Sequence, residues 1–349
     1  SGQLTISLPA GITTYSVAYA CPLYGTDEQE FIQFHSLEDG SSIYGTCLGA
    51  GSSAAPPMGT LTGSVDASAF PSATNMQIEV STSSYAQIAQ LPVGALQVSG
   101  PTGTDRVLIG LYDSSYLSLL AIKAFNNQAV PGALNAGHAV TFISSDATTL
   151  QPITFANVPA GFSSPFVSAW ALGVFMLSNG VVTQYPQLPS GVMQSGDFYS
   201  LQAVSTLGSG AQTSAVGSVL YPAGGPATLT FPAPWSTGGP TAASLPVFTF
   251  DYEEYAGKSG VSDAGTLTWL PTSGQQAQIF MTASGNYMGS TTSLAVPDLS
   301  SVGGFLAPPA SGMSIFWSEM VSQGTFPSTT SLAGGSATYV SAEGSYTVP

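Results

Sequence analysis

The densest group of carboxylates in this 349-residue chain lies in the segment FDYEEY, which holds Asp251, Glu253 and Glu254, with Asp263 ten residues beyond Glu253. Alternation along an extended strand puts Asp251 and Glu253 on one face of a sheet and Glu254 on the other. Two carboxylates on one face can bind Ca²⁺ through oxygen atoms or act as an acid and base pair. We take Asp251, Glu253 and Asp263 as a candidate Ca²⁺ site, although a solvated strand end accounts for the same residues without a ligand.

Other signatures of catalysis and metal binding are missing from the sequence. It contains no Gly-x-Ser-x-Gly, Asp-Thr-Gly or Asp-Ser-Gly motif, and its two histidines, His35 and His138, suit ordinary surface or strand-end positions. Two cysteines and two histidines without close spacing cannot form a zinc site, and GKSG at 257–260 lacks the spacing of a phosphate-binding loop. The sequence therefore predicts no enzymatic activity and no cofactor other than Ca²⁺ at that one site.

The two cysteines, Cys21 and Cys47, each end an alternating run, so each points to the apolar side of its strand. We predict a disulfide between them, with two separate buried thiols as the alternative. A disulfide would place the protein in an oxidising compartment.

The charge composition narrows the classes of partner. Only 3 residues are Lys or Arg against 18 Asp or Glu, giving a formal net charge of -15, and charged residues make up 6% of the chain. Nucleic acid and anionic membranes are therefore poor partners, because the chain has few cations to neutralise phosphates. The longest apolar stretch, 166–177, is too short to span a bilayer, so we predict no transmembrane segment. Without a basic and apolar leader, the chain fits a secreted product, extracellular or at the cell surface, whose signal peptide has been removed.

The pattern of residues predicts an all-β fold. Strand-like runs of four to eight residues recur along the chain, separated by Gly, Pro, Ser or Asn, and no window keeps a helical period. Short strands at this spacing are typical of antiparallel β-sandwiches of the immunoglobulin-like kind, and a chain of this length needs several such modules joined by short Pro/Gly-rich linkers.

An internal similarity supports the prediction that the chain consists of several modules. The segment LTISLPAG at 4–11 resembles ITFANVPAG at 153–161, and each is followed by an alternating aromatic run. We place an N-terminal β-sandwich region at 1–149, either one module or two with a seam near 49–59. A middle module follows at 150–225 and a C-terminal module at 226–349. The texture of the whole chain is similar to that of secreted bacterial or archaeal surface proteins built from immunoglobulin-like sandwiches.

The leading functional hypothesis is a non-catalytic extracellular structural protein, a subunit of a surface filament, sheath or coat. We expect copies of the chain to associate through strand edges and apolar contacts, since exposed edges accept added strands. Candidate assembly strands are the two ends of the chain: Gln3, Leu4, Thr5, Ile6, Ser7 and Leu8, and Ser345, Tyr346, Thr347 and Val348. The alternatives are a secreted adhesin or glycan-binding protein and an acid-tolerant hydrolase centred on Asp251 and Glu253.

Overall fold

The computed structural model describes residues 8–22, 28–39, 57–80, 85–91, 95–115, 118–171, 175–195, 197–208, 211–220, 224–235, 239–255, 258, 260–271, 276–289, 292–324 and 336–349. The regular secondary structure of these residues is almost entirely β-strand, which confirms the predicted all-β class. The only α-helix among them, α1 (Gly285–Met288), is a single turn. Within the described ranges no helix has the length and apolar character needed to cross a bilayer.

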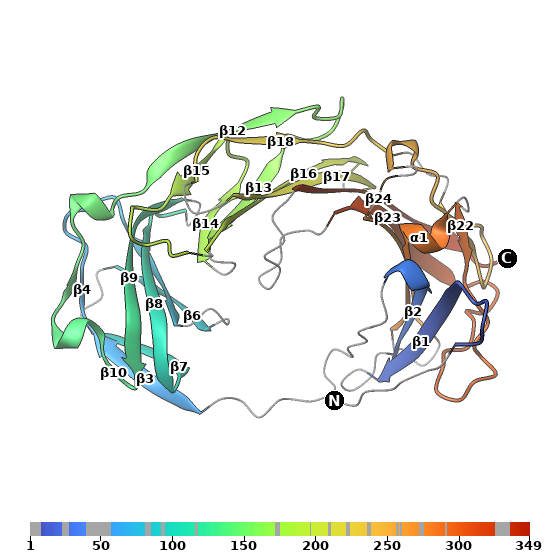
Figure 1. The fold of residues 1–349 in the computed structure, drawn as a ribbon, viewed down its shortest axis with the longest axis horizontal. Coiled ribbons are helices and arrows are strands. Elements are labelled where there is room, and N and C mark those ends of the chain that lie inside the picture. The colour runs from blue at the N-terminus through green and yellow to red at the C-terminus, as the bar shows by residue number, and fades with distance from the viewer. Residues whose placement is uncertain are drawn as a thin grey trace.

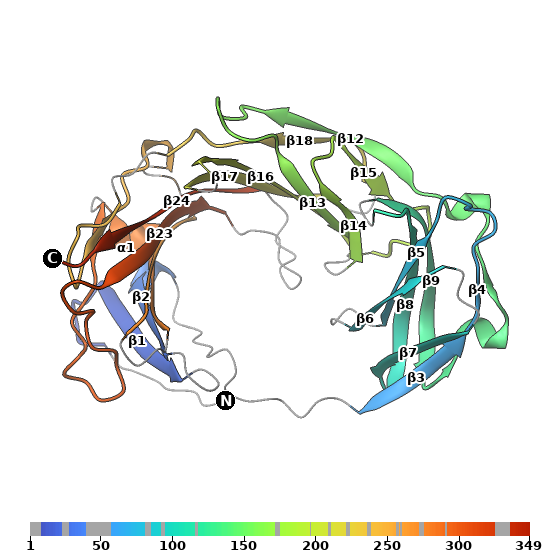
Figure 2. The ribbon, with the colours of Figure 1, turned by 180° about the vertical axis from the view of Figure 1, so that it is seen from behind.

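The largest sheet of the described structure has ten strands. Its ten strands lie in the order β1 (Thr14–Pro22), β2 (Glu28–Ser36), β21 (Ala277–Ser284), β20 (Val261–Trp269), β23 (Ser314–Gln323), β24 (Ser336–Thr347), β17 (Gln212–Leu220), β16 (Tyr199–Leu207), β13 (Phe166–Ala171) and β14 (Phe175–Gly180). Figures 1 and 2 show the described strands as an open arc, with β12 and β18 outside β13, β16 and β17.

Smaller sheets complete the arc. A four-stranded sheet has the order β6 (Tyr85–Gln90), β5 (Asn75–Val80), β8 (Gly103–Tyr112) and β9 (Leu119–Val130). The other sheets combine β10 (Gly132–Ala133), β3 (Met58–Gly63) and β7 (Leu96–Pro101); β11 (Val140–Thr141) and β4 (Val65–Asp66); β15 (Gln184–Gln187), β12 (Thr149–Ala156) and β18 (Ala227–Thr230); and β19 (Val247–Thr249) and β22 (Ser293–Ala295). Short 3₁₀ turns occur at Leu37–Asp39, Leu134–Gly137, Ser144–Asp146 and Glu253–Tyr255.

Three hydrophobic cores hold these sheets together. The first core consists of buried residues between Leu61 and Phe142. The middle core draws its residues from between Leu108 and Phe231. The C-terminal core joins Ile32 and Phe34, near the start of the chain, to residues between Trp235 and Val348.

The first and middle cores share a sheet. Along β8, Val107, Ile109 and Leu111 face the first core, while Leu108 and Tyr112 face the middle core. Gly110 lies on the middle side, where a Cβ atom would come within 2.5 Å of the Phe175 ring. Because both faces are covered, every residue of β5 is buried. This sheet, rather than a flexible linker, connects the two cores.

The N-terminal hairpin belongs with the opposite end of the chain. Strand β2 pairs in parallel with β21, from Glu28 with Ala277 to Phe34 with Ala283. The predicted boundaries at 1–149, 150–225 and 226–349 stay a prediction, but β1 and β2 pack with the C-terminal core. Pairing between segments some 250 residues apart leaves no local signal in a sequence.

The internal similarity in the sequence corresponds to a repeated turn. Gly11 and Gly161 both adopt positive φ, 88° and 82°, and the next residue donates a backbone hydrogen bond to Pro9 and to Pro159 respectively. A β-turn with positive φ at its third position requires glycine. Each turn leads into a strand of the large sheet, β1 or β13.

Of the two predicted assembly strands, the structure describes the C-terminal one fully and only one residue of the N-terminal one. Residues 3–7 lie outside the described residues, and Leu8 is exposed. Ser345, Tyr346 and Thr347 form the end of β24, where they pair with Phe316, Ile315 and Ser314 of β23, and Val348 is buried. Cys21 is 2% exposed, whereas Cys47 lies outside the described residues. The disulfide therefore stays a prediction.

Candidate functional site

The segment FDYEEY leaves the sheet earlier than alternation predicts. Strand β19 ends at Thr249, and Glu253–Tyr255 forms a 3₁₀ turn. The turn buries the Tyr252 and Tyr255 rings, which lie edge to face with centroids 4.7 Å apart, while Glu253 and Glu254 are exposed. The two-face alternation expected for these residues is thus wrong beyond Thr249, because packing of the two tyrosines overrides the strand pattern.

Glu254 is held in place by two donors. Its Oε2 accepts hydrogen bonds from the Ala233 backbone N–H at 2.7 Å and from the Tyr252 hydroxyl at 2.6 Å. The Tyr252 oxygen also lies 2.7 Å from the carbonyl oxygen of Ala233. Burial, together with the adjacent Glu254 carboxylate, raises the pKa of Tyr252 far above its usual range, so its proton is retained.

Glu254 lies at a polar cleft of about 410 Å³ where residues of the middle and C-terminal cores meet. The cleft is lined by Asn157, Thr230, Phe231, Pro232, Glu254, Tyr255, Gln323, Gly324 and Thr338. The Tyr255 hydroxyl shares a hydrogen bond with Thr338, and burial raises the pKa of Tyr255 to about 12. The Lys258 ammonium lies 5.4 Å from the centre of the Tyr255 ring.

The lining of this cleft is rich in groups that form hydrogen bonds. Two amides, two threonine hydroxyls and one carboxylate can donate and accept hydrogen bonds. Among the described residues that line the cleft, Glu254 is the single carboxylate, whereas glycoside hydrolysis uses a pair of them.

The three residues of the candidate Ca²⁺ site are not brought together. Asp251 is exposed and accepts a hydrogen bond from the Trp235 indole N–H at 3.2 Å, while Glu253 is exposed in the 3₁₀ turn. Asp263 is 5% exposed in β20, where burial raises the pKa of its carboxyl to about 7. Among the described residues, no three or more Asp, Glu, His or Cys side chains form a group able to hold a metal ion.

Buried carboxylates are a structural feature that the sequence analysis did not predict. Glu30, Glu79, Asp263 and Glu319 are each 5% exposed or less. Glu79 accepts a hydrogen bond from Gln77 at 2.8 Å, and burial raises its pKa to about 6. In β5, Gln77 and Glu79 alternate with Met76 and Ile78. Such alternation predicts that the polar residues face solvent, and only the presence of a second core shows that they are buried.

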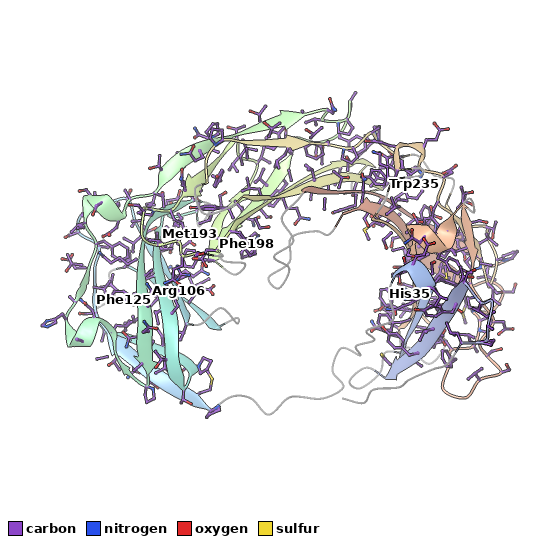
Figure 3. The ribbon with its side chains drawn as sticks, in the orientation of Figure 1. His35, Arg106, Phe125, Met193, Phe198 and Trp235 are labelled. Atoms are coloured by element: carbon purple, nitrogen blue, oxygen red, sulfur yellow. The ribbon has the colours of Figure 1, made fainter. Side chains whose placement is uncertain are left out.

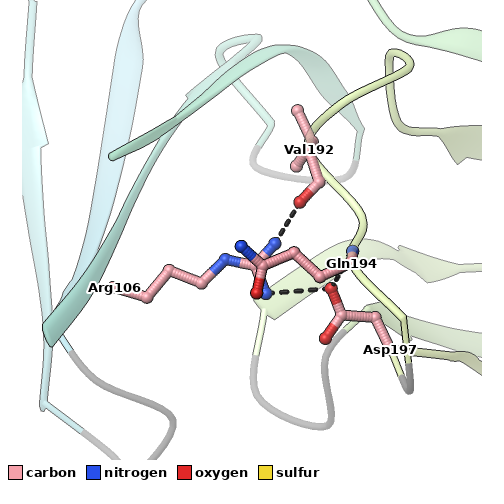
Figure 4. A network of polar contacts seen from close by, with 4 residues as sticks. All are labelled: Arg106, Val192, Gln194 and Asp197. Carbon is pink, nitrogen blue, oxygen red and sulfur yellow. Dashed lines mark hydrogen bonds and ion pairs between the residues drawn. The ribbon is translucent and has the colours of Figure 1, made fainter. Parts of the chain in front are cut away.

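The basic side chains form contacts within the chain. Arg106 Nη1 lies 2.9 Å from Asp197, and Nη2 donates to the carbonyl oxygen of Val192, as Figure 4 shows. Figure 3 places Arg106 near Met193 and Phe198, far along the arc from His35 and Trp235. Lys123 lies 2.8 Å from Asp146. Together with Lys258 above Tyr255, all three cations of the chain have partners within it.

The two histidines lie in different surroundings, and neither lines the cleft at Glu254. His35 stacks on Tyr15 with ring centroids 5.6 Å apart on the side of β2 opposite the C-terminal core, and its Nε2 is buried. His138 is exposed immediately after the 3₁₀ turn that ends at Gly137.

The chain shows little similarity to known proteins. No family model and no curated protein matches the chain. Among solved structures, the chain is weakly similar to the FN1-FN3 domains of chicken CNTN1, with 8% identity, 76% of this chain and 93% of that chain covered, and a TM-score of 0.15. A likeness at that TM-score carries no argument about fold or function.

Proposed function

We propose that this chain is a non-catalytic extracellular structural protein, a subunit of a surface filament, sheath or coat in which copies associate through strand edges and apolar contacts. The proposal includes the reading of the cores as tandem immunoglobulin-like sandwich modules. The low content of charged residues, 6%, supports a place outside the cell, where hydroxyls and amides maintain solubility.

The observation that carries the proposal is the edge of the ten-stranded sheet at β1. This strand is nine residues long and contains no charged residue, and within the described structure its outer side pairs with no strand. Monomeric proteins commonly protect long edges with lysines or short strands, since an unprotected edge accepts another chain. Apart from Pro22 at its end, β1 has none of these protections among the residues that the structure describes, which fits a protein that assembles.

Electron microscopy of negatively stained native material tests the proposal. We expect regular assemblies, whereas dispersed monomers at high concentration would contradict it. Ser16→Lys should reduce assembly, because Ser16 is exposed on β1 and a lysine there disfavours edge pairing. Ser301→Lys, an equally exposed serine in a turn, is the matched control and should assemble as the unmodified chain does.

A second candidate function, a secreted adhesin or glycan-binding protein, is favoured by the polar cleft at Glu254. Its lining offers amides, hydroxyls and one fixed carboxylate, which can form hydrogen bonds with sugar hydroxyls, while the Phe231 and Tyr255 rings are buried in the cores. A glycan array tests it: saturable binding that is weakened at least tenfold by Glu254→Gln or Gln323→Ala, but not by Asp298→Asn at an exposed turn, would support this function. A uniformly blank array would remove it.

A further inference from the structure

Strand β1 carries two aromatic stacks that stop at the edge of the ten-stranded sheet. In the first stack, Tyr19 lies on Phe31 and Phe31 lies on Phe280, with adjacent ring centroids 5.0 Å apart and interplanar angles of 9° and 12°. In the second stack, Tyr15 lies on His35 with centroids 5.6 Å apart. Within the described structure β1 is the last strand on this side, and both tyrosines are partly exposed. Each stack therefore ends in a tyrosine ring on the open edge.

The backbone of β1 also points hydrogen-bonding groups toward this edge. The Leu37 N–H donates to the Thr13 carbonyl oxygen at 2.9 Å, in register with the pairing of β1 and β2. Along an antiparallel strand, residues that bond one neighbour alternate with residues that point to the other side. The odd-numbered residues of β1 thus bond β2, and the even-numbered residues point their N–H and C=O groups outward: Thr14, Ser16, Ala18 and Ala20.

The side chains of β1 allow a second strand of the same sequence to approach. Ala18 packs against the C-terminal core, so Tyr15, Val17 and Tyr19 lie on the other face of the sheet. The strand contains no charged residue, so two copies of it meet without repulsion between like charges. Figures 1 and 2 place β1 at one end of the arc of described strands, where a second molecule can reach it.

We propose that two copies of the chain pair their β1 strands in antiparallel orientation about a two-fold axis at Val17. In this register Ser16 of each copy lies opposite Ala18 of the other, and these residues exchange backbone hydrogen bonds. Tyr19 of each copy lies opposite Tyr15 of the other in a non-hydrogen-bonded pair, where side chains approach more closely. The inference rests on the proposed assembly through strand edges and names its partner, a second copy of this chain.

The aromatic stacks select this register. With the axis at Val17, the stack that ends at Tyr19 in one copy continues onto the stack that begins at Tyr15 in the other, and the same happens a second time across the axis. In the two adjacent registers that keep the hydrogen-bonding pattern, Tyr19 lies opposite Val17 or Thr13, so the stacks do not join. Offset stacking of aromatic rings stabilises a contact beyond the area that it buries. The two-fold contact joins two copies, and a longer assembly adds a different contact elsewhere.

A symmetric disulfide tests the contact. Across the axis the two Val17 residues form a non-hydrogen-bonded pair, whose Cα atoms lie about 4.5 Å apart, a separation that a disulfide can bridge. Under mild oxidation Val17→Cys should give covalent dimers, joined between the two positions 17 when digests are analysed by mass spectrometry. The matched control is Thr282→Cys, an exposed position on β21, which is paired on both sides. This control should give no covalent dimers.

Sedimentation equilibrium tests the aromatic stacks. Tyr19→Ala removes both contacts between Tyr19 and Tyr15 across the axis, so we expect the dissociation constant of the dimer to rise at least tenfold. Tyr19→Phe keeps the ring and should dimerise as the unmodified chain does. Phe316→Ala is the control, because it removes a ring that is 63% exposed on β23, away from the edge. This variant should also dimerise normally.

The outcomes separate this contact from the proposed function. An unmodified chain that stays monomeric at high concentration, or equal dimerisation of Tyr19→Ala and Tyr19→Phe, overturns the contact. If regular assemblies form while position 17 never cross-links, the contact fails and the assembly function stands. If dimers linked at position 17 form but electron microscopy shows no larger assembly, the contact stands and the filament, sheath or coat function fails.

Discussion

Asp263 and Glu319 are buried on the same core-facing side of the neighbouring strands β20 and β23, one diagonal step apart. Asp263 pairs with Val321 and Gly265 pairs with Glu319, so the two acids lie two residues apart along one face. They are 5% and 1% exposed. The glycine opposite Glu319 leaves room for the Phe248 ring, which a Cβ atom would approach to 3.0 Å. An all-β core thus contains two carboxyl groups in largely apolar surroundings.

Stability should therefore rise as the pH falls from about 7 to about 4. Burial raises the pKa of Asp263 from 3.8 to about 7, so between these values the folded state binds a proton that the unfolded state releases. The stabilisation is fully present below the unfolded pKa and is lost as the pH rises through the folded pKa, a difference of about 4 kcal/mol. Urea unfolding across this pH range measures it.

Asparagine at this position removes the titration. Asp263→Asn should flatten most of the dependence on pH, leaving the smaller contribution of Glu79, whose pKa burial raises to about 6. Asp298→Asn is the control, since Ser300 donates to this exposed carboxylate and lowers its pKa. An unfolding free energy that falls on acidification from pH 7 to pH 5 would refute the argument.

A second prediction concerns the joint between the first and middle cores. Arg106→Met removes the guanidinium that contacts Asp197 and the Val192 carbonyl oxygen. The Arg106 side chain is only 13% exposed. We expect a loss of about 2–3 kcal/mol in unfolding free energy, somewhat below the range for a fully buried pair. Lys258→Met, which removes an exposed cation, should stay within about 0.5 kcal/mol. Equal losses of unfolding free energy for the two substitutions would show that the contacts of Arg106 between the two cores do not stabilise the fold.

Features that depend on neighbouring residues in the sequence could be predicted, whereas features that depend on contacts between distant segments could not. Local alternation predicts the all-β class, and the two similar Pro-Ala-Gly segments correspond to matching turns. The early end of β19 depends on the burial of Tyr252 and Tyr255, and the burial of Glu79 depends on a second core. The pairing of β2 with β21 is set by tertiary packing alone. The cleft at Glu254 also joins residues from five separate segments, so spacing along the chain could not reveal it.

The predicted disulfide between Cys21 and Cys47 can be tested by thiol labelling. The native protein should resist alkylation at both positions, since Cys21 is 2% exposed, and should gain two labels only after denaturation and reduction. Closing this loop would stabilise the fold by about 3.5 kcal/mol in the chain-entropy account. The double variant Cys21→Ser/Cys47→Ser should lose a comparable amount in urea unfolding. Labelling of both thiols in the native protein would exclude the bond.

The last prediction concerns the forces between subunits. Arg106 and Lys123 lie 2.9 Å and 2.8 Å from carboxylates of their own chain, and Lys258 lies over the Tyr255 ring. Since these are all the Lys and Arg residues of the chain, the exposed Lys258 is the one cation without a carboxylate partner among them, and it cannot form a network of salt bridges between copies by itself.

Assembly should then be almost insensitive to added NaCl, because salt screens charges and leaves backbone pairing and apolar contact unchanged. It should strengthen on acidification toward pH 4, as protonation of carboxylates reduces the self-repulsion of a chain with a net charge of -15. Light scattering across salt and pH series measures both effects. Assemblies that dissolve in moderate NaCl, or that separate on mild acidification or addition of a Ca²⁺ chelator while the subunits stay folded, would instead indicate contacts held by ions.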